Sequence, residues 1–296
     1  MSHPPAGIAA LRACTRPLGP AARTLAVGPW RIGFEGLDEG LAAALDLRWG
    51  GFCLAHPDAA PSPTVRCVAA AGPWLPSTPG EAYRIEAEVE EGLPVVRSYR
   101  FLAGPEAPGV WRAAFARDGG EPEDRVFDNL ARWFIARCAI ESGGLALHGA
   151  GVARDGRGWI FAGASRAGKS TAVRLSAPAG SLGDDFAVAW PEGGEWWTCA
   201  VPFDNSERAP AAAGPARIPV ARMCRLIQAP AASVEPVRPA ALAAATLLSL
   251  AAFPWALPDL LDDLAANASA FVGAGPGLVD LRFRLDPDFW PLLVRD

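Results

Sequence analysis

One eight-residue segment constrains this 296-residue chain more than any other, because it matches the pattern G-x-x-x-x-G-K-[ST]. In that pattern, backbone N–H groups surround a polyphosphate and the lysine neutralises its charge. Lys169 is the single lysine among the 27 lysine and arginine residues. A compact ammonium and a planar guanidinium differ in donor geometry, which is a reason to keep lysine here. The predicted phosphate-binding residues are Gly163, Ala164, Ser165, Arg166, Ala167, Gly168, Lys169, Ser170 and Thr171.

The residues on either side of this segment favour a strand–loop–helix arrangement. Residues 158–162 form a short apolar run that predicts a strand, and residues 169–177 can open a helix. The first N–H groups of a helix have no partner within the helix and can face an anion. The alternative is an ordinary Gly/Ala-rich turn before a helix. We take binding of a nucleotide's phosphates as the working prediction.

Composition narrows the class of partner and the compartment. A net charge of −5 and a pI near 5.4 argue against a general nucleic-acid or anionic-membrane binder. The six cysteines form no C-x-x-C and no zinc-like spacing, and the three histidines are too dispersed for a histidine-based metal centre. Since the start of the chain shows no leader pattern, we expect reduced thiols and a cytoplasmic protein.

One uncharged stretch, residues 240–257, approaches the lower length limit of a membrane span. Alanine supplies much of it, Pro254 interrupts it, and no cluster of positive charge flanks it. We therefore predict a buried helix and no membrane partner.

Hydrophobic periodicity predicts an α/β protein with two regions. Hairpin turns on both sides of the glycine loop, at residues 154–158 and 191–194, indicate a mixed sheet. Residues 1–120 are expected to form a smaller N-terminal α+β region of unknown role with antiparallel strands, and residues 121–296 the catalytic domain. In the first region we expect strands at 24–34, 65–69, 83–89, 95–102 and 110–117, and a helix at 37–49, after an extended or frayed lead. In the second we expect helices at 124–141, 240–253 and 258–271, and strands at 145–153, 159–162, 181–190, 196–201, 220–229 and 278–285.

Two adjacent carboxylates, Asp184 and Asp185, follow Gly183 downstream of the loop. One carboxylate could hold Mg²⁺ while the other takes the proton of an attacking hydroxyl, and neighbouring acids raise each other's pKa. The alternative is a solvent-facing Gly-Asp-Asp turn. Ser170 occupies the motif position whose hydroxyl binds the metal. His148 ends an apolar run on the strand antiparallel to the one feeding the loop, so it is either a site residue or a core histidine.

Leu147-His148-Gly149, the hairpin, the Gly-Lys-Ser loop and Gly-Asp-Asp occur in an order and spacing that resemble the HPr kinase/phosphorylase family. The resemblance covers roughly residues 125–285 and extends more distantly to ATP-dependent phosphoenolpyruvate carboxykinase. It implies the mixed-sheet, P-loop fold of that family's catalytic domain, with ATP phosphates and Mg²⁺ bound by Lys169 and Ser170. It further implies that Asp184 is the base, Asp185 a metal ligand and His148 a phosphate or acceptor contact.

The chain also departs from that family. In place of the glycine-containing signature with a catalytic arginine, it has residues 201–208, in which Glu207 and Arg208 are either weak site candidates or solvated loop charges. The first region does not resemble the family's own N-terminal domain. HPr itself is therefore not predicted as the substrate.

The resulting prediction is an ATP-dependent kinase that phosphorylates a serine-type hydroxyl on a peptide, protein or small molecule. A nucleotide-binding regulatory or scaffolding module without transfer activity is the main alternative. A carboxykinase-like enzyme would need metal ligands that the sequence does not provide. Members of the HPr kinase family assemble as hexamers, so a homo-oligomer is an open alternative for this chain.

Overall fold

A computed structural model describes residues 7–55, 60–75, 84–117, 122–203 and 217–294. The chain forms two compact units. The first comprises Met1–Ile135 with Phe253–Asp259, and the second comprises Ala136–Ala252 with Leu260–Asp296. The boundary expected between residues 120 and 121 stays a prediction, since residues 118–121 lie outside the described ranges.

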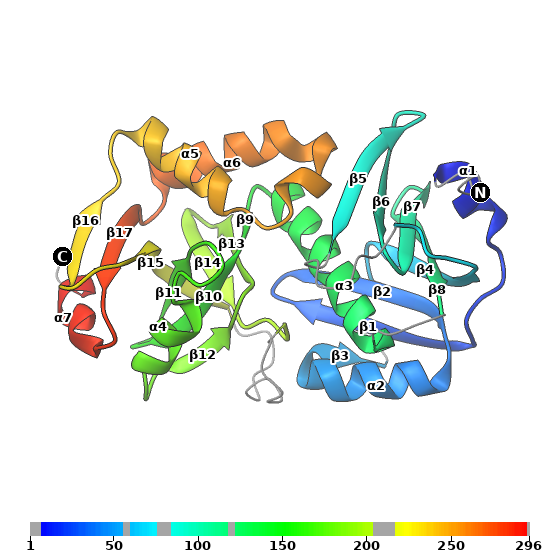
Figure 1. Ribbon diagram of the computed structural model, residues 1–296, viewed down its shortest axis with the longest axis horizontal. Coiled ribbons are helices and arrows are strands. Elements are labelled where there is room, and N and C mark those ends of the chain that lie inside the picture. The colour runs from blue at the N-terminus through cyan, green and yellow to red at the C-terminus, as the bar shows by residue number, and fades with distance from the viewer. Residues whose placement is uncertain (1–6, 56–59, 76–83, 118–121, 204–216, 295–296) are drawn as a thin grey trace. The chain divides into compact units, whose positions relative to one another are not determined.

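The first unit contains an eight-stranded sheet in the order β3-β1-β2-β4-β8-β7-β6-β5 (Figure 1). β4 runs parallel to both β2 and β8, so the prediction of purely antiparallel strands is wrong. After β4 the chain makes three further strands before β8 returns beside it, and single-strand patterns do not encode such non-local pairing. The strands are β1 (Ala21–Val27), β2 (Trp30–Leu37), β3 (Cys53–Leu54), β4 (Thr64–Ala70), β5 (Ile85–Glu90), β6 (Leu93–Ser98), β7 (Phe101–Ala107) and β8 (Val110–Ala116).

Two strands predicted in this unit are in fact hairpins. The run predicted at 24–34 is the β1–β2 hairpin, which turns at Gly28 with φ 53°. The run predicted at 95–102 is divided between β6 and β7. The lead before residue 24 is also more ordered than expected, because it contains α1 (Ile8–Ala13) and the start of β1. Tyr83, the predicted first residue of β5, lies outside the described residues.

The helices of the first unit follow the sequence pattern closely. α2 (Glu39–Trp49) begins after Asp38, whose carboxylate accepts a hydrogen bond from the Leu41 N–H, as an N-cap does. α3 (Glu123–Glu141) buries Val126, Leu130 and other residues at the predicted 3–4 spacing. In α3, Asp128 accepts hydrogen bonds from Arg48 and from the Trp49 indole, which fixes α2 against α3.

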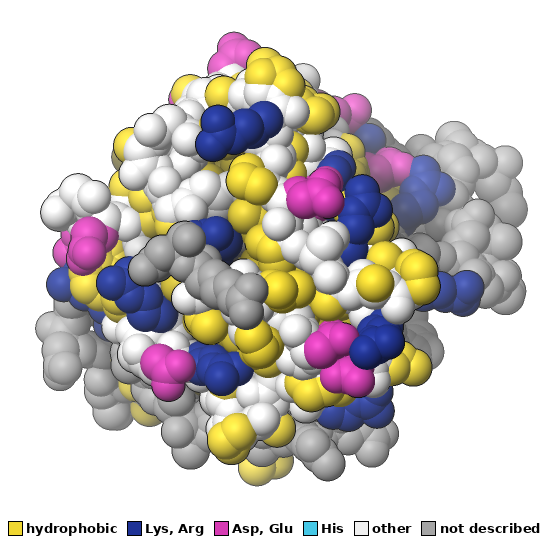
Figure 2. Space-filling view, turned by 90° about the vertical axis from the view of Figure 1, so that its left-hand side faces the viewer, with side chains coloured by type: hydrophobic (Ala, Val, Ile, Leu, Met, Phe, Trp, Pro, Cys, Tyr) yellow, Lys and Arg dark blue, Asp and Glu magenta, His cyan; other side chains and the backbone are white. Residues whose placement is uncertain are grey.

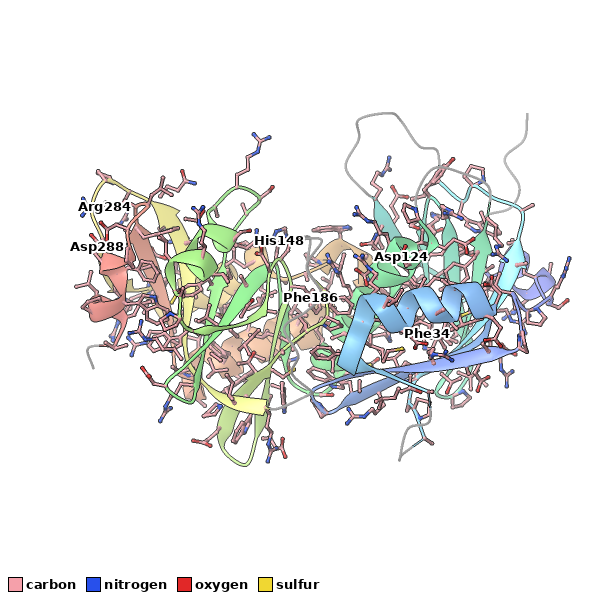
Figure 3. The ribbon with its side chains drawn as sticks, turned by 90° about the horizontal axis from the view of Figure 1, so that it is seen from below. Phe34, Asp124, His148, Phe186, Arg284 and Asp288 are labelled. Carbon is pink, nitrogen blue, oxygen red and sulfur yellow. The ribbon has the colours of Figure 1, made fainter. Side chains whose placement is uncertain are left out.

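Aromatic side chains fill the core between the sheet and these helices. Phe34 lies 5.5 Å from Trp49, and Phe115 stacks on Phe127 at 4.3 Å between ring centroids. Figure 3 labels Phe34 together with Asp124, which lies in the first turn of α3. These contacts place one face of α3 in the core.

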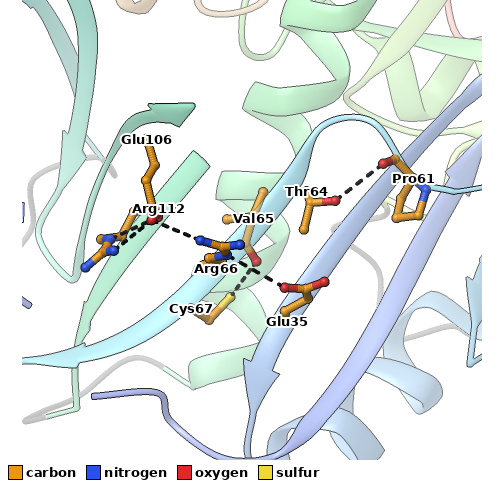
Figure 4. A network of polar contacts seen from close by, with 8 residues as sticks. All are labelled: Glu35, Pro61, Thr64, Val65, Arg66, Cys67, Glu106 and Arg112. Atoms are coloured by element: carbon orange, nitrogen blue, oxygen red, sulfur yellow. Dashed lines mark hydrogen bonds and ion pairs between the residues drawn. The ribbon is translucent and has the colours of Figure 1, made fainter. Parts of the chain in front are cut away.

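An arginine–carboxylate network lies on the same sheet (Figure 4). Arg112 donates two hydrogen bonds to Glu106, and Arg66 donates one at 3.0 Å to the same carboxylate. Glu35 is 4.0 Å from Arg66. The two guanidinium groups lower the pKa of Glu106, chiefly through the Arg112 hydrogen bonds. Arg66 is half exposed, so the network contributes little to stability.

The second unit contains a nine-stranded mixed sheet, which confirms the predicted mixed α/β class. Its main path is β12-β10-β11-β15-β14-β13-β9, and β17 pairs with β15 and β16. β11, β15 and β17 run parallel, whereas the hairpins on either side are antiparallel. The strands are β9 (Leu145–Leu147), β10 (Gly149–Arg154), β11 (Arg157–Ala162), β12 (Gly180–Gly183), β13 (Ala187–Glu192), β14 (Glu195–Cys199), β15 (Arg217–Gln228), β16 (Ser233–Pro236) and β17 (Leu278–Phe283).

Both faces of this sheet are covered. α4 (Lys169–Leu175) and α7 (Trp290–Leu293) pack on the face that carries Phe161 and Leu226 (Figure 1). Ile160 points the other way by strand alternation and is also fully buried. α6 (Leu261–Ala274) packs through Phe271 on Trp196 of β14, with 4.8 Å between ring centroids. On the end of this unit shown in Figure 2, basic, acidic and apolar side chains are interspersed.

The uncharged stretch at 240–257 does not form one helix. α5 (Ala240–Leu250) ends three residues before the predicted end, and Pro254 opens a short 3-10 turn, Pro254–Ala256. α5 buries Ala243 and Leu247, as a core helix should. Within the described part of the chain, no helix has both the length and the apolar character needed to cross a membrane.

Candidate phosphate-binding site

The glycine loop, residues 163–168, joins β11 to α4 in the predicted strand–loop–helix order. Gly168 has φ 105°, a left-handed conformation that favours glycine. A Cβ at Gly168 would lie 2.7 Å from Cζ of Phe283, so the position also lacks room. Arg166 has φ 66°, and its carbonyl accepts a 2.8 Å hydrogen bond from Gln228 of the neighbouring strand. Gln228 therefore holds the loop to the end of β15.

Lys169 turns back into the glycine loop. Its Nζ donates hydrogen bonds to the carbonyls of Gly163 at 3.1 Å and Ala164 at 3.2 Å, and lies 3.5 Å from Oδ1 of Asp185. The side chain is only 7% exposed. Burial lowers the pKa of Lys169, and the negative charges of Asp185 and, more weakly, Asp184 partly oppose that effect. The ammonium group is thus desolvated beside both predicted acids.

His148 lies at a break between two strands. The predicted strand at 145–153 is divided there, because β9 pairs with β13 whereas β10 pairs with β11 and β12. The backbone N–H of His148 donates a hydrogen bond to the Leu250 carbonyl. The backbone carbonyl of His148 accepts one from the Gly163 N–H at the start of the glycine loop. Its Nε2 is 2.7 Å from Oδ1 of Asp185. His148 therefore belongs to the polar cluster; the core-histidine alternative does not describe it.

A second strand break faces the first. The continuous strand predicted at 181–190 is wrong, because β12 ends at Gly183 and β13 begins at Ala187. Gly183 has φ 145° and Asp185 has φ 88°. A non-glycine residue at positive φ carries conformational strain, which structures tolerate most often at functional sites. Figure 3 labels His148 and Phe186, which flank this junction of the two interrupted strands.

The predicted metal ligands differ in their surroundings. The Ser170 side chain is exposed in the first turn of α4, while Asp185 is about one-quarter exposed and already contacts Lys169 and His148. Among the described residues, no group of three or more His, Cys, Asp or Glu side chains could hold a metal. A magnesium ion bound with a polyphosphate needs only one or two protein ligands and takes the rest from phosphate and water. Ser170 and Asp185 fit that kind of site.

The remaining predicted residues fall into three groups. Ala164, Ser165 and Arg166 are exposed at the tip of the glycine loop, whereas Ala167 is half-buried. One oxygen of the Asp184 carboxylate is buried. Glu207 and Arg208 lie outside the described residues, as do all of residues 204–216. The structure thus brings together His148, Lys169, Asp185 and the loop.

A pocket of about 550 Å³ opens beside the loop and was not predicted from the sequence. It lies where the parallel strands β15 and β17 end, next to the first turn of α4. Its lining is Gly168, Thr171, Gln228, Ala229, Phe283, Arg284 and Leu285. The signal that could have located it is strand polarity, because ligands of open α/β sheets bind outside the carboxyl ends of parallel strands. Applying it requires knowing that β11, β15 and β17 are neighbours, which the sequence pattern does not reveal.

The second unit is therefore a mixed α/β unit in which a glycine loop between strand and helix adjoins a lysine–aspartate–histidine cluster. The family model described as SynChlorMet cassette protein ScmC matches residues 128–263 of the chain, a range that includes the loop, His148 and both acids. No curated protein matches the chain.

The match corrects the resemblance inferred from the sequence. The family whose model matches this region is ScmC and not an HPr kinase family, so the assignment to the HPr kinase family is wrong. Four short elements in order were too few to identify a family. Roles for Asp184, Asp185 and His148 therefore rest on the geometry of the site and not on that resemblance.

Proposed function

We propose that the second unit binds a nucleoside triphosphate, ATP, with Mg²⁺ and transfers its terminal phosphoryl group to a hydroxyl of a peptide, protein or small molecule. The observation that carries the proposal is the position of Lys169. Its buried ammonium lies between the carbonyls of the glycine loop and the Asp185 carboxylate. A loop that presents N–H groups at a helix start, with a lysine turned into it, is suited to a polyphosphate.

The hydrogen bonds of Lys169 favour phosphate oxygens over its present carbonyl acceptors. In the structure Lys169 satisfies its donors with neutral carbonyls and one carboxylate, although burial disfavours its charge. Phosphate oxygens would replace those carbonyls with charged acceptors, and charge-assisted hydrogen bonds are roughly twice as strong as neutral ones. Lys169 would then offset the charge that develops on the transferred group.

The two acids are suited to different tasks. Asp185 contacts Lys169 and His148, so we assign it with Ser170 to the metal, which would supply further charge neutralisation when bound. Asp184 has one buried carboxylate oxygen, next to the loop and the other acid. A carboxylate is a usual general base, and Asp184 lies close enough to Lys169 to interact with its charge, so we assign Asp184 as the base. It takes the proton of the acceptor hydroxyl while the acceptor oxygen bonds to the γ-phosphorus, and the bond from that phosphorus to the bridging oxygen breaks to release ADP.

The role of the loop is tested with Lys169→Ala. We expect ATP affinity, measured by isothermal titration calorimetry with Mg²⁺ present, to fall about 100-fold, the equivalent of roughly 3 kcal/mol. Arg174→Ala is the matched control, because it removes one positive charge from an exposed position of the same helix. Equal affinity in wild type and Lys169→Ala would refute the proposal.

The role of the base is tested with Asp184→Asn. We expect ATP affinity within about twofold of wild type, but a rate of phosphoryl transfer lower by roughly 10²–10⁴-fold, the usual contribution of a general base. Transfer is followed with γ-labelled ATP and candidate hydroxyl acceptors. Asp155→Asn, an exposed aspartate in the β10–β11 turn, is the control. ATP binding without turnover in the wild type would instead support the regulatory module.

A further inference from the structure

The pocket beside the glycine loop extends away from the polar cluster. It shares Gly168 and Thr171 with the predicted phosphate-binding segment, so a ligand can occupy loop and pocket together. Its other lining residues are the last residue of β15, the last residue of β17 and the residues directly after them, and none is His148, Asp184 or Asp185. A volume of about 550 Å³ is within the range typical of small-molecule sites.

We propose that this pocket, the nucleoside pocket, receives the base and ribose of the nucleoside triphosphate whose phosphates occupy the glycine loop. The inference rests on the proposed function, because it takes the loop to bind a polyphosphate. It adds where the nucleoside binds, and that contacts with the nucleoside contribute to affinity beyond those with the polyphosphate. The part of the ligand beyond its phosphates leaves the loop on the side of β17.

The chemistry of the lining suits a base with its sugar. Phe283, Ala229 and Leu285 provide apolar surface, and Leu285 is 79% exposed, so it has solvent-accessible area that a base can cover. The Gln228 Nε2 group donates a hydrogen bond to the Arg166 carbonyl. The Oε1 atom of the same amide is an acceptor that a base or ribose could use. Thr171 adds a hydroxyl group one helical residue after Ser170.

Arg284 supplies the charged group of the pocket. Its guanidinium is 2.9 Å from Asp288 and 3.7 Å from Asp286, so two carboxylates orient it (Figure 3). A planar guanidinium can stack on a base or donate to ribose hydroxyls. The paired carboxylates also reduce its net attraction for phosphate, which favours a neutral nucleoside over a second polyphosphate at this position.

The test compares ATP with inorganic triphosphate, which keeps the phosphates and lacks the nucleoside. Affinities are measured by calorimetry in the full chain with Mg²⁺. In the wild type we expect ATP to bind at least about tenfold more tightly. Ala229→Trp fills the half-buried pocket wall and should abolish that preference while leaving triphosphate affinity unchanged. Ala231→Trp, two residues further on at an exposed position outside the lining, should behave like wild type.

A second variant guards against misfolding of Ala229→Trp. Leu285→Ala truncates an exposed side chain and should weaken ATP binding about threefold without affecting triphosphate binding. Leu242→Ala, at an exposed position of α5 outside the pocket, should change neither affinity. Unchanged ATP preference in both pocket variants, or equal binding of ATP and triphosphate by the wild type, overturns the nucleoside pocket and leaves the loop proposal standing. Failure of the wild type to bind either ligand overturns both.

Discussion

We expect Lys169 to lower the stability of the folded protein. Its side chain is almost fully buried, and desolvation is the largest influence on its pKa. Groups kept for binding are often unfavourable for stability. We therefore expect Lys169→Met, which keeps the length of the stem, to raise the free energy of unfolding at pH 7 by about 1 kcal/mol. Urea unfolding measures it, and Arg174→Met, at an exposed position of the same helix, should show no such gain.

The stability difference between Lys169→Met and the wild type should depend on pH. The pKa of Lys169 in the folded protein is below the ordinary value of 10.5. At a pH between the lowered pKa of the folded protein and 10.5, the unfolded chain binds a proton at Lys169 that the folded protein does not. The stability of the wild type therefore rises with pH across this window. Methionine does not titrate. The advantage of Lys169→Met over wild type should therefore shrink as the pH approaches 10.5, and an advantage that stays constant or grows would contradict the assignment.

Asp185 should be coupled energetically to Lys169. Asparagine tolerates positive φ, so Asp185→Asn removes the charge while keeping the backbone conformation. In the wild type we expect a loss of about 1–2 kcal/mol, because the buried ammonium loses its nearest carboxylate. In the Lys169→Met background the loss should be smaller, retaining only the His148 contact. Equal losses in both backgrounds of this double-mutant cycle would show that the contact carries no energy.

At the scale of elements, the sequence predicted the glycine loop and helix well and the strand breaks poorly. The glycine loop and α4 follow from local signals, namely two glycines and an apolar pattern. Position 148 lies inside an apolar run that looks continuous, and positions 184 and 185 are two acids directly before another such run, yet β9–β10 and β12–β13 each change pairing partners there. Such a change depends on non-local hydrogen bonds, which a residue pattern does not contain.

The approach of β17 to the loop predicts a specific sensitivity at Gly168. Gly168→Ala combines positive φ with a Cβ 2.7 Å from the buried Phe283 ring, which has little freedom to move. We expect a loss of about 1–3 kcal/mol in thermal or urea unfolding. Gly273→Ala in α6 is the matched control, since its Cβ would meet no atom within 4 Å. That change should stabilise by roughly 0.5–1 kcal/mol, because alanine is the better helix former.

At the scale of the whole molecule, the sequence predicted the class but not the arrangement of strands. The mixed α/β class follows from helical and strand patterns together, and the hairpins beside the loop indicated a mixed sheet correctly. The order of strands in both sheets did not follow, because β4 in one unit and β15 in the other pair with strands distant in sequence. The nucleoside pocket was missed for the same reason, as β15 and β17 meet only in the folded chain.

All residues assigned to nucleotide binding belong to the second unit, so binding should stabilise that unit selectively. A ligand at 100 times its dissociation constant adds about 2.7 kcal/mol to the state that binds it. For a unit of this size, that corresponds to a rise of roughly 5–10 °C in its calorimetric transition. Mg-ATP should produce this shift in the wild type but not in Lys169→Ala, and a transition of the first unit, where it is separate, should stay in place. If Lys169→Ala shifted as far as the wild type, stabilisation would have to come from a site other than the glycine loop.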